Sequence, residues 1–152
     1  MMRGVAMAPG VLTAGGLTTR DGCRPNIAIV GGSPAGALIA TVLCQQFGCS
    51  TIAAPSGESV LALLRGKTRI DLVVMDLSVT DMDGIVAVQL IRALGSRGNL
   101  PIIALTGNPA DMTSNRARIA GFTGLVVKPY SPRELHVAIR GALTRTAAAQ
   151  PA

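Results

Sequence analysis

The sequence predicts one α/β domain with a doubly wound parallel sheet, and three observations support this. Five short apolar runs alternate along the chain with segments of helical periodicity. The runs are rich in Val and Ile and lack polar alternation, as expected for strands buried on both faces of a sheet. The length of 152 residues fits one domain with tails, and no linker or internal repeat divides it. Five strands alternating with five helices give a parallel sheet covered by helices.

The predicted strands are the apolar runs, and in such sheets ligands bind beyond the carboxyl ends of the strands. The first run is followed by Gly31-Gly32, the third by Asp76, the fourth by Thr106 and the fifth by Lys128-Pro129. The topology therefore brings a carboxylate, a hydroxyl and an ammonium group to one rim. The runs themselves are Ile27–Val30, Thr51–Ala53, Leu72–Met75, Ile102–Leu105 and Leu125–Val127.

Capping residues and periodicity define the first three predicted helices. The first begins near Pro34 with Ser33 as its N-cap, and the second runs from about Ser56 to Leu64. The third starts after Gly84, and Asp83 is expected to cap it. The apolar residues expected to share one face are Leu38, Ile39, Val42 and Leu43 in the first helix, and Ala87, Val88, Ile91 and Leu94 in the third.

The last two predicted helices differ in polarity. The fourth, more polar helix lies between Pro109 and Ala120, and Gly121 suits its C-terminal cap. The fifth follows Ser131, and its His136 is expected at the surface. The apolar face of the fifth helix consists of Leu135, Ala138, Ile139 and Ala142.

Composition restricts the classes of function. Aromatic residues make up 2% of the chain, so the core is aliphatic and stacking platforms for single-stranded nucleic acid are not expected. The 14 Lys and Arg residues give a net charge of +6, but they are scattered, so direct binding of nucleic acid is not expected. No apolar run approaches the length of a membrane span. Cys23, Cys44 and Cys49 lack CxxC spacing, which argues against a disulfide framework or a zinc site and favours the cytoplasm.

The ends of the chain are expected to be tails. Residues 1–25 are interrupted by glycines and Pro9, which break any signal-peptide core, and are expected to be flexible. Residues 26–145 form the predicted domain, and residues 146–152 a second tail. Because few residues follow the fifth helix, no output domain is expected, and any signal would leave through protein contacts.

Three segments in register resemble the receiver domain of two-component response regulators. DLVVMDLSVTDMDG (71–84) resembles the segment of the phosphorylated aspartate, LPIIALTGN (100–108) the segment of the switch Ser/Thr, and GFTGLVVKPY (121–130) the Lys-Pro segment. Thr106 and Lys128 follow Asp76 by 30 and 52 residues, which also fits the family. The resemblance covers about residues 26–145. It implies a flavodoxin-like (βα)5 fold, with a five-stranded sheet in the order 2-1-3-4-5.

The resemblance also implies a function, that of a single-domain receiver in phosphorelay signalling. Asp76 would be the phosphoacceptor, Lys128 would contact a phosphoryl oxygen, and Thr106 would be the switch hydroxyl. The implied partners are a histidine kinase or phosphotransfer protein, and a downstream protein at the face of helix 4, strand 5 and helix 5. The protein would not be an enzyme, beyond self-phosphorylation from small phosphodonors and slow autodephosphorylation.

The sequence departs from the family pattern around the phosphoacceptor. The family places acidic residues that help to hold Mg²⁺ after the first strand, where this chain has Gly31-Gly32, and no carboxylate occurs between Asp21 and Glu58. Since Mg²⁺ usually takes one or two carboxylates, we expect its binding at Asp76 to be severely weakened. Two further departures are Leu125 in place of an aromatic switch residue and Thr80 in place of a proline. Asp81 is expected in a loop.

Two alternatives remain open from the sequence. A receiver fold without metal ligands could be a phosphorylation-independent docking module. An acidic partner could then meet the side of helices 4 and 5. The segment IAIVGGSPAG (27–36) also resembles a Rossmann dinucleotide fingerprint, but Ser33 replaces its second glycine and no acid ends the second strand. The arginines on the side of helices 4 and 5 are Arg116, Arg118, Arg133 and Arg140.

Overall fold

A computed structural model describes residues 16–78, 81–108, 110 and 121–144 of the chain. Five parallel strands form one sheet in the order β2-β1-β3-β4-β5, which confirms the predicted fold class and strand order. The chain therefore reverses its direction of winding between β1 and β3, as a doubly wound sheet does. The strands are β1 (Asn26–Val30), β2 (Ser50–Ala54), β3 (Leu72–Asp76), β4 (Ile102–Thr106) and β5 (Gly124–Val127).

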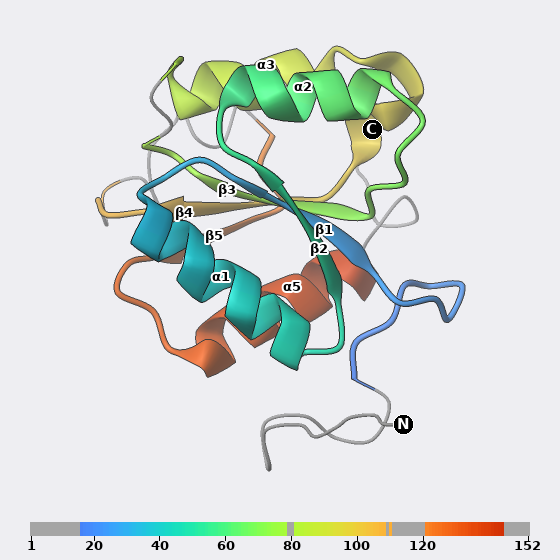
Figure 1. Ribbon diagram of the computed structural model, residues 1–152, viewed down its shortest axis with the longest axis vertical. Coiled ribbons are helices and arrows are strands. Elements are labelled where there is room, and N and C mark those ends of the chain that lie inside the picture. Colours follow the sequence, from blue (N-terminus) through green and yellow to red (C-terminus); the bar gives the residue numbers. More distant parts are fainter. Residues whose placement is uncertain (1–15, 79–80, 109, 111–120, 145–152) are drawn as a thin grey trace.

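Helices cover both faces of the sheet (Figure 1). Helices α1 (Pro34–Gln46) and α5 (Pro132–Thr144) lie on one face. Helices α2 (Gly57–Arg65) and α3 (Gly84–Arg92) lie on the other, and a short 3-10 helix, η1 (Gly95–Asn99), follows α3. The predicted fourth helix lies outside the described residues, apart from Ala110. Among the described residues, no helix is long and apolar enough to span a membrane.

The two central strands explain why the sheet forms. Every residue of β3 and β4 is buried. Their apolar side chains belong to two aliphatic clusters, one between the sheet and each helix layer. In the parallel register Asp76 pairs with Leu105 and Thr106 with Val127. The ends of β3, β4 and β5 thus meet at one rim, as the apolar runs predicted.

The two predicted caps, Ser33 and Asp83, are present, and a third helix also begins with a side-chain cap. The Ser33 side chain accepts a hydrogen bond from the Gly36 N–H at 3.0 Å, and Asp83 accepts one from the Ile85 N–H at 2.8 Å. Ser56 accepts from the Ser59 N–H at 3.0 Å, so it is the N-cap rather than the first residue of α2. Each cap satisfies an N–H that the first helical turn leaves without an intrahelical acceptor.

The expected orientation of the first helix is wrong. Leu38, Ile39 and Val42 are 63%, 54% and 42% exposed, so the predicted apolar face points mostly to solvent. The helix instead turns Ala40 and Cys44 toward the sheet. Small side chains three to four residues apart allow the helix to pack close to the strands, and this places the larger residues outside.

The fifth helix has the predicted buried face, with one difference. Leu135, Ile139 and Ala142 are buried, and Ala138 packs beside them. His136, expected at the surface, is half-buried and stands edge-on to the ring of Phe47, with ring centroids 4.8 Å apart. Burial, followed by the charges of the nearby Arg140 and Arg133, lowers its pKa.

The ordered packing begins before residue 26. Leu17 is buried in the cluster under α1 and α5, and its N–H donates to the Phe47 carbonyl at 3.0 Å. Thr19 and Cys23 close a short turn through two hydrogen bonds: the Thr19 N–H donates to the Cys23 carbonyl at 2.9 Å, and the Cys23 N–H donates to the Thr19 hydroxyl oxygen, Oγ1, at 3.1 Å. Within residues 16–25, Leu17 therefore packs against the domain that is predicted to begin at residue 26.

Candidate functional site

Two polar side chains are buried at the carboxyl end of the sheet. Asp76 ends β3 and is 6% exposed, and Thr106 ends the adjacent strand β4 and is 4% exposed. They are the buried polar residues of the part of the chain that the structure describes. Because burying a carboxylate is costly unless it is paired and hydrogen-bonded, the surroundings of Asp76 decide what this rim can do.

Both oxygens of the Asp76 carboxylate have partners. The Lys128 ammonium donates to Oδ2 at 2.8 Å. Ser78 donates to Oδ1 through its N–H at 2.8 Å and through its hydroxyl at 2.5 Å. The structure thus brings together Asp76 and Lys128, which the strand ends predicted. The role of Ser78 was missed, although a residue two positions after an Asp is where an Asx-turn places an N–H donor.

The charge of Asp76 is stabilised in the folded state. Burial on its own raises the pKa of this carboxyl, but the hydrogen bonds from Lys128 and Ser78 and the Lys128 charge outweigh it. The pKa of Asp76 is therefore held below the ordinary value of an aspartate. The group is ionised at neutral pH, as a nucleophile must be.

Lys128 reaches Asp76 from the loop that follows β5. Its N–H donates to the Thr106 carbonyl at 2.7 Å, which continues the pairing of β4 with β5 past the end of the strand. The peptide bond to Pro129 is cis. The lysine side chain is 37% exposed, so the ammonium lies between the buried carboxylate and solvent. Because the lysine side chain is flexible and partly exposed, its ammonium group can move toward a new negative group bound at Asp76.

Thr106 lies beside this pair, on the neighbouring strand. Its hydroxyl oxygen accepts a hydrogen bond from the Asn108 N–H at 3.1 Å, which shapes the turn after β4. Register places Thr106 one position beyond Leu105, the partner of Asp76. The predicted hydroxyl is thus at the rim, at the end of β4 and one position beyond the level of Asp76.

The glycine pair after β1 closes over the carboxylate. Gly31 and Gly32 have φ angles of +70° and +82°, in the left-handed region that favours glycine. A Cβ atom at Gly32 would lie 2.7 Å from Asp76 Oδ2. Glycine is therefore favoured at position 32 for two reasons. The φ angle is positive, and a Cβ atom could enter only if Asp76 shifted.

Among the described residues, Asp76 is the carboxylate found at this rim. Mg²⁺ needs several oxygen ligands in octahedral geometry, usually with one or two carboxylates. Asp76 supplies one carboxylate, and an ammonium already contacts its Oδ2. Within the described ranges, no group of three His, Cys, Asp or Glu side chains could hold a metal ion.

The two acidic residues that follow in the loop act as helix caps. Asp83 caps α3, as predicted. Asp81, predicted only as a loop residue, accepts hydrogen bonds from the N–H groups of Gly57 and Glu58 at 2.9 and 3.0 Å. These two donors hold the pKa of Asp81 below its ordinary value. A contact across 24 residues leaves no signal in the local sequence, so this tie between the loop and α2 was not foreseeable.

Two further positions were singled out in the sequence. Leu125 lies in β5 opposite Ala104 and is partly exposed. Tyr130, two residues after Lys128, packs partly buried against the cluster under α1 and α5. Burial, then the proximity of Cys44 and Asp76, raises its pKa. Thr80 lies outside the described residues.

The comparisons with known proteins agree on one family. The family model of the response regulator receiver domain matches residues 27–140. The heme response regulator HssR of Staphylococcus aureus is 40% identical over 91 residues, which are 60% of this chain and 39% of that protein. The chain therefore spans about two fifths of the length of the curated relative that it matches.

Solved structures show the same fold. The chemotaxis response regulator CheY4 of Vibrio cholerae aligns with a TM-score of 0.72 at 24% identity, over 78% of this chain and 98% of that chain. The receiver domain of the sensor histidine kinase PA1611 from Pseudomonas aeruginosa aligns with a TM-score of 0.71 at 23% identity. That match covers 80% of this chain and 99% of the other, which has a magnesium ion coordinated in its active-site cleft.

Proposed function

Because the chain belongs to the response regulator receiver domain family, we propose that it accepts a phosphoryl group on Asp76 in phosphorelay signalling. The observation that carries this proposal is the buried Asp76 carboxylate at the end of β3, paired at 2.8 Å with the Lys128 ammonium. The family match decides against the dinucleotide-binding alternative for residues 27–36.

The proposed chemistry is a transfer of a phosphoryl group to a carboxylate. An Asp76 oxygen attacks the phosphorus of the donor, the bond from phosphorus to the donor atom breaks, and the donor leaves with that electron pair. The product is an acyl phosphate. Lys128 would then bind a phosphoryl oxygen as a point charge, and the Thr106 hydroxyl would donate to another after it turns toward the group.

Both carboxylate oxygens are engaged before the reaction, so one contact has to be released. Ser78 is exposed and its hydroxyl can rotate away from Oδ1. We propose that Oδ1 is the attacking oxygen, because Lys128 can keep its contact with Oδ2 while the phosphoryl group approaches. Attack through Oδ2 would require the ammonium to move and Gly32 to open.

Receiver domains typically bind Mg²⁺, and one structural neighbour carries it, but this rim lacks the acidic ligands for it. We propose that phosphorylation of Asp76 depends weakly or not at all on Mg²⁺, with Lys128 as the cation at the carboxylate. The closeness of Gly32 to Asp76 Oδ2 supports this, because a side chain at position 32 would be strained by the positive φ angle and would force Asp76 to shift.

The proposed partners are proteins. A histidine kinase or phosphotransfer protein would supply the phosphoryl group, and a downstream protein would bind at the face of helix 4, strand β5 and helix α5. On α5, Arg133 and Arg140 are exposed, while Arg116 and Arg118 lie outside the described residues. We further propose residues 26–145 as the domain, a cytoplasmic location, and no catalysis beyond self-phosphorylation and slow autodephosphorylation.

The experiment is intact mass spectrometry after incubation with acetyl phosphate. We expect a mass increase of one phosphoryl group in the wild type, with and without Mg²⁺, and none in Asp76→Asn. Thr106→Ala and Lys128→Met should form the adduct more slowly. No adduct under any condition would favour the docking module that works without phosphorylation.

A second experiment tests the role of the glycine pair. Aspartates at both positions, Gly31→Asp with Gly32→Asp, would supply the family's acidic pair. We expect calorimetry to show little gain in Mg²⁺ binding, because both backbone φ angles are positive and the Gly32 Cβ would collide with Asp76. Tight Mg²⁺ binding by this double variant would mean that the backbone can change to the family's usual arrangement.

A further inference from the structure

We propose that the amino-terminal end of the sheet carries a second binding site, which takes a small organic phosphate of mononucleotide size. A cavity of about 510 Å³ opens there, between the segments that lead into β3 and β4, the turn at residues 19–21 and the end of α5. It lies at the opposite end of β3 from Asp76. Its volume falls in the usual range of small-molecule sites, roughly 300–1,000 Å³.

Three arginines, Arg20, Arg69 and Arg97, line the cavity together with two aspartates, Asp21 and Asp71. Arginine presents a planar fork of donors that matches phosphate oxygens in pairs. An anion is therefore the ligand class that the charged part of the wall recognises.

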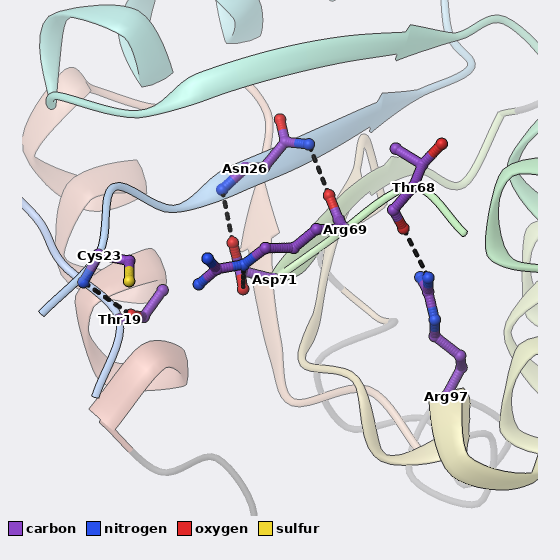
Figure 2. A network of polar contacts seen from close by, with 7 residues as sticks. All are labelled: Thr19, Cys23, Asn26, Thr68, Arg69, Asp71 and Arg97. Atoms are coloured by element: carbon purple, nitrogen blue, oxygen red, sulfur yellow. Dashed lines mark hydrogen bonds and ion pairs between the residues drawn. The ribbon is translucent and has the colours of Figure 1, made fainter. Parts of the chain in front are cut away.

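Arg97 is the residue that points most directly to a missing acceptor. Its Nη2 donates to the Thr68 carbonyl at 2.6 Å (Figure 2). The same nitrogen lies 3.4 Å from the Gly66 carbonyl, to which it also donates. Its Nη1 is buried and, within the described part of the chain, has no hydrogen-bond partner. A desolvated cationic donor without an acceptor is costly, and a phosphate oxygen would remove that cost. Because Nη1 is covered, the partly exposed side chain has to shift slightly to present it.

The neighbouring Arg92 differs from Arg97, because its guanidinium nitrogens all have acceptors. Its guanidinium makes four hydrogen bonds to backbone carbonyls, two to Gly121, one to Gly98 and one to Leu100. Arg92 is satisfied by the fold alone. Arg97 is held by carbonyls on one nitrogen only.

The carboxylate of Asp71 does not block an anion, because it is already neutralised. Its Oδ1 lies 3.0 Å from Arg69 Nε, and its Oδ2 accepts the Asn26 N–H at 2.8 Å. Figure 2 shows the Arg69 side chain lying against Asp71, while Arg97 approaches from the other side of the network. Asp71 is therefore engaged with the protein, whereas Arg97 Nη1 would gain an acceptor if the side chain shifted toward a bound ligand.

The uncharged residues that line the cavity favour an organic phosphate over inorganic phosphate. Ile70, Leu100, Pro101 and Leu143 give the cavity an apolar side, against which a flat base can lie. The amide of Asn99 can bond the polar edge of such a base. A nucleoside monophosphate combines the anion, the base and a suitable size. This site is independent of phosphorylation at Asp76.

Methyl NMR of the whole chain tests the proposal, with adenosine and guanosine 5′-monophosphates, the two nucleosides and inorganic phosphate as probes. We expect the monophosphates to shift the methyl signals of Ile70, Leu100 and Leu143 in a saturable way, and to leave Leu105 and Val127 near Asp76 unchanged. Arg97→Gln should weaken binding about tenfold, the loss of one charge-assisted interaction. Arg140→Gln, an equal charge change on exposed α5, should change it less than about twofold.

Several results would overturn the proposal. If free phosphate or a nucleoside binds as tightly as the monophosphate, the site does not recognise phosphate and base together, and the proposal is wrong. If Arg140→Gln loses as much affinity as Arg97→Gln, the monophosphate is attracted by the net charge of the protein and not by this site. Absence of saturation up to roughly 5 mM would show that there is no site. If Arg97→Gln fails to fold, Arg97→Lys decides, because it keeps the charge but loses the fork and should still weaken binding severalfold.

Discussion

The two ends of the sheet stabilise their buried and half-buried charges in different ways. At the carboxyl end, the Asp76 carboxylate is balanced by the Lys128 ammonium, which comes from a partly exposed side chain. At the amino-terminal end, the Arg92 guanidinium is held by three backbone carbonyls, from Gly98, Leu100 and Gly121.

The difference suits the carboxyl end of the sheet to a functional site and the amino-terminal end to a structural role. Backbone carbonyls cannot leave without unfolding the loops that carry them, so the Arg92 contacts fix the loops before β4 and β5. An ammonium on a flexible side chain can move with the charge that it balances. The carboxyl end of the sheet can therefore change its charge while the amino-terminal end keeps the strands in place.

The strongest test of this contrast is Arg92→Met. The substitution keeps an apolar stem but removes all four donors, so the carbonyls of Gly98, Leu100 and Gly121 lose their partner. We expect the free energy of unfolding in urea to fall by about 3 kcal/mol. The matched control is Arg65→Met at an exposed position of α2, which should stay within about 0.5 kcal/mol. Equal effects at the two positions would refute the supporting role of Arg92.

Lys128→Met should have the next largest effect. It leaves the Asp76 carboxylate buried without its cation, which costs about 2 kcal/mol after allowance for the partial exposure of the lysine. Adding Asp76→Asn should recover most of the loss, because the neutral amide needs no counter-charge. Urea unfolding of the two single variants and the double variant gives the coupling energy. Additive losses would mean that the pair does not stabilise the fold.

The carboxyl end was the more predictable of the two ends. Asp76, Thr106 and Lys128 each follow a buried apolar run, and parallel strands bring such positions together by topology alone. What the sequence could not give was the backbone at Gly31-Gly32, whose positive φ angles close the space beside Asp76. A glycine pair marks conformational freedom but does not show in which direction it is used.

The amino-terminal end and the first helix were not predictable. Arg92 contacts carbonyls up to 29 residues away, and a carbonyl acceptor carries no side-chain signature. In α1, nearly every residue is apolar or small, so periodicity could not distinguish the side of Leu38 and Ile39 from the side of Ala40 and Cys44. Shape complementarity with the sheet decided the orientation, and only the folded chain contains that information.

The two ends should also differ in their response to acid. The folded-state pKa of Asp76 lies below that of an unfolded aspartate, about 3.9, so its contribution to stability is complete above that pH. It is lost as the pH falls through the lower pKa of the folded state. Below about pH 4 the stability of the wild type should therefore fall more steeply than that of Asp76→Asn, whereas Arg92→Met should keep the wild-type slope. Parallel curves for wild type and Asp76→Asn would contradict the stabilised charge.

The smallest effects are expected at the exposed ion pair of Arg69 with Asp71. The Arg69 side chain is 53% exposed, so Arg69→Gln should leave the free energy of unfolding nearly unchanged. Asp71→Ala should cost more, about 1 kcal/mol, because it also removes the acceptor of the Asn26 N–H at the start of β1. Chemical denaturation at low and high salt separates the two terms, since only the ion pair is screened. A larger loss in Arg69→Gln than in Asp71→Ala would mean that side-chain charge, rather than bonding to the backbone, holds this end of the sheet.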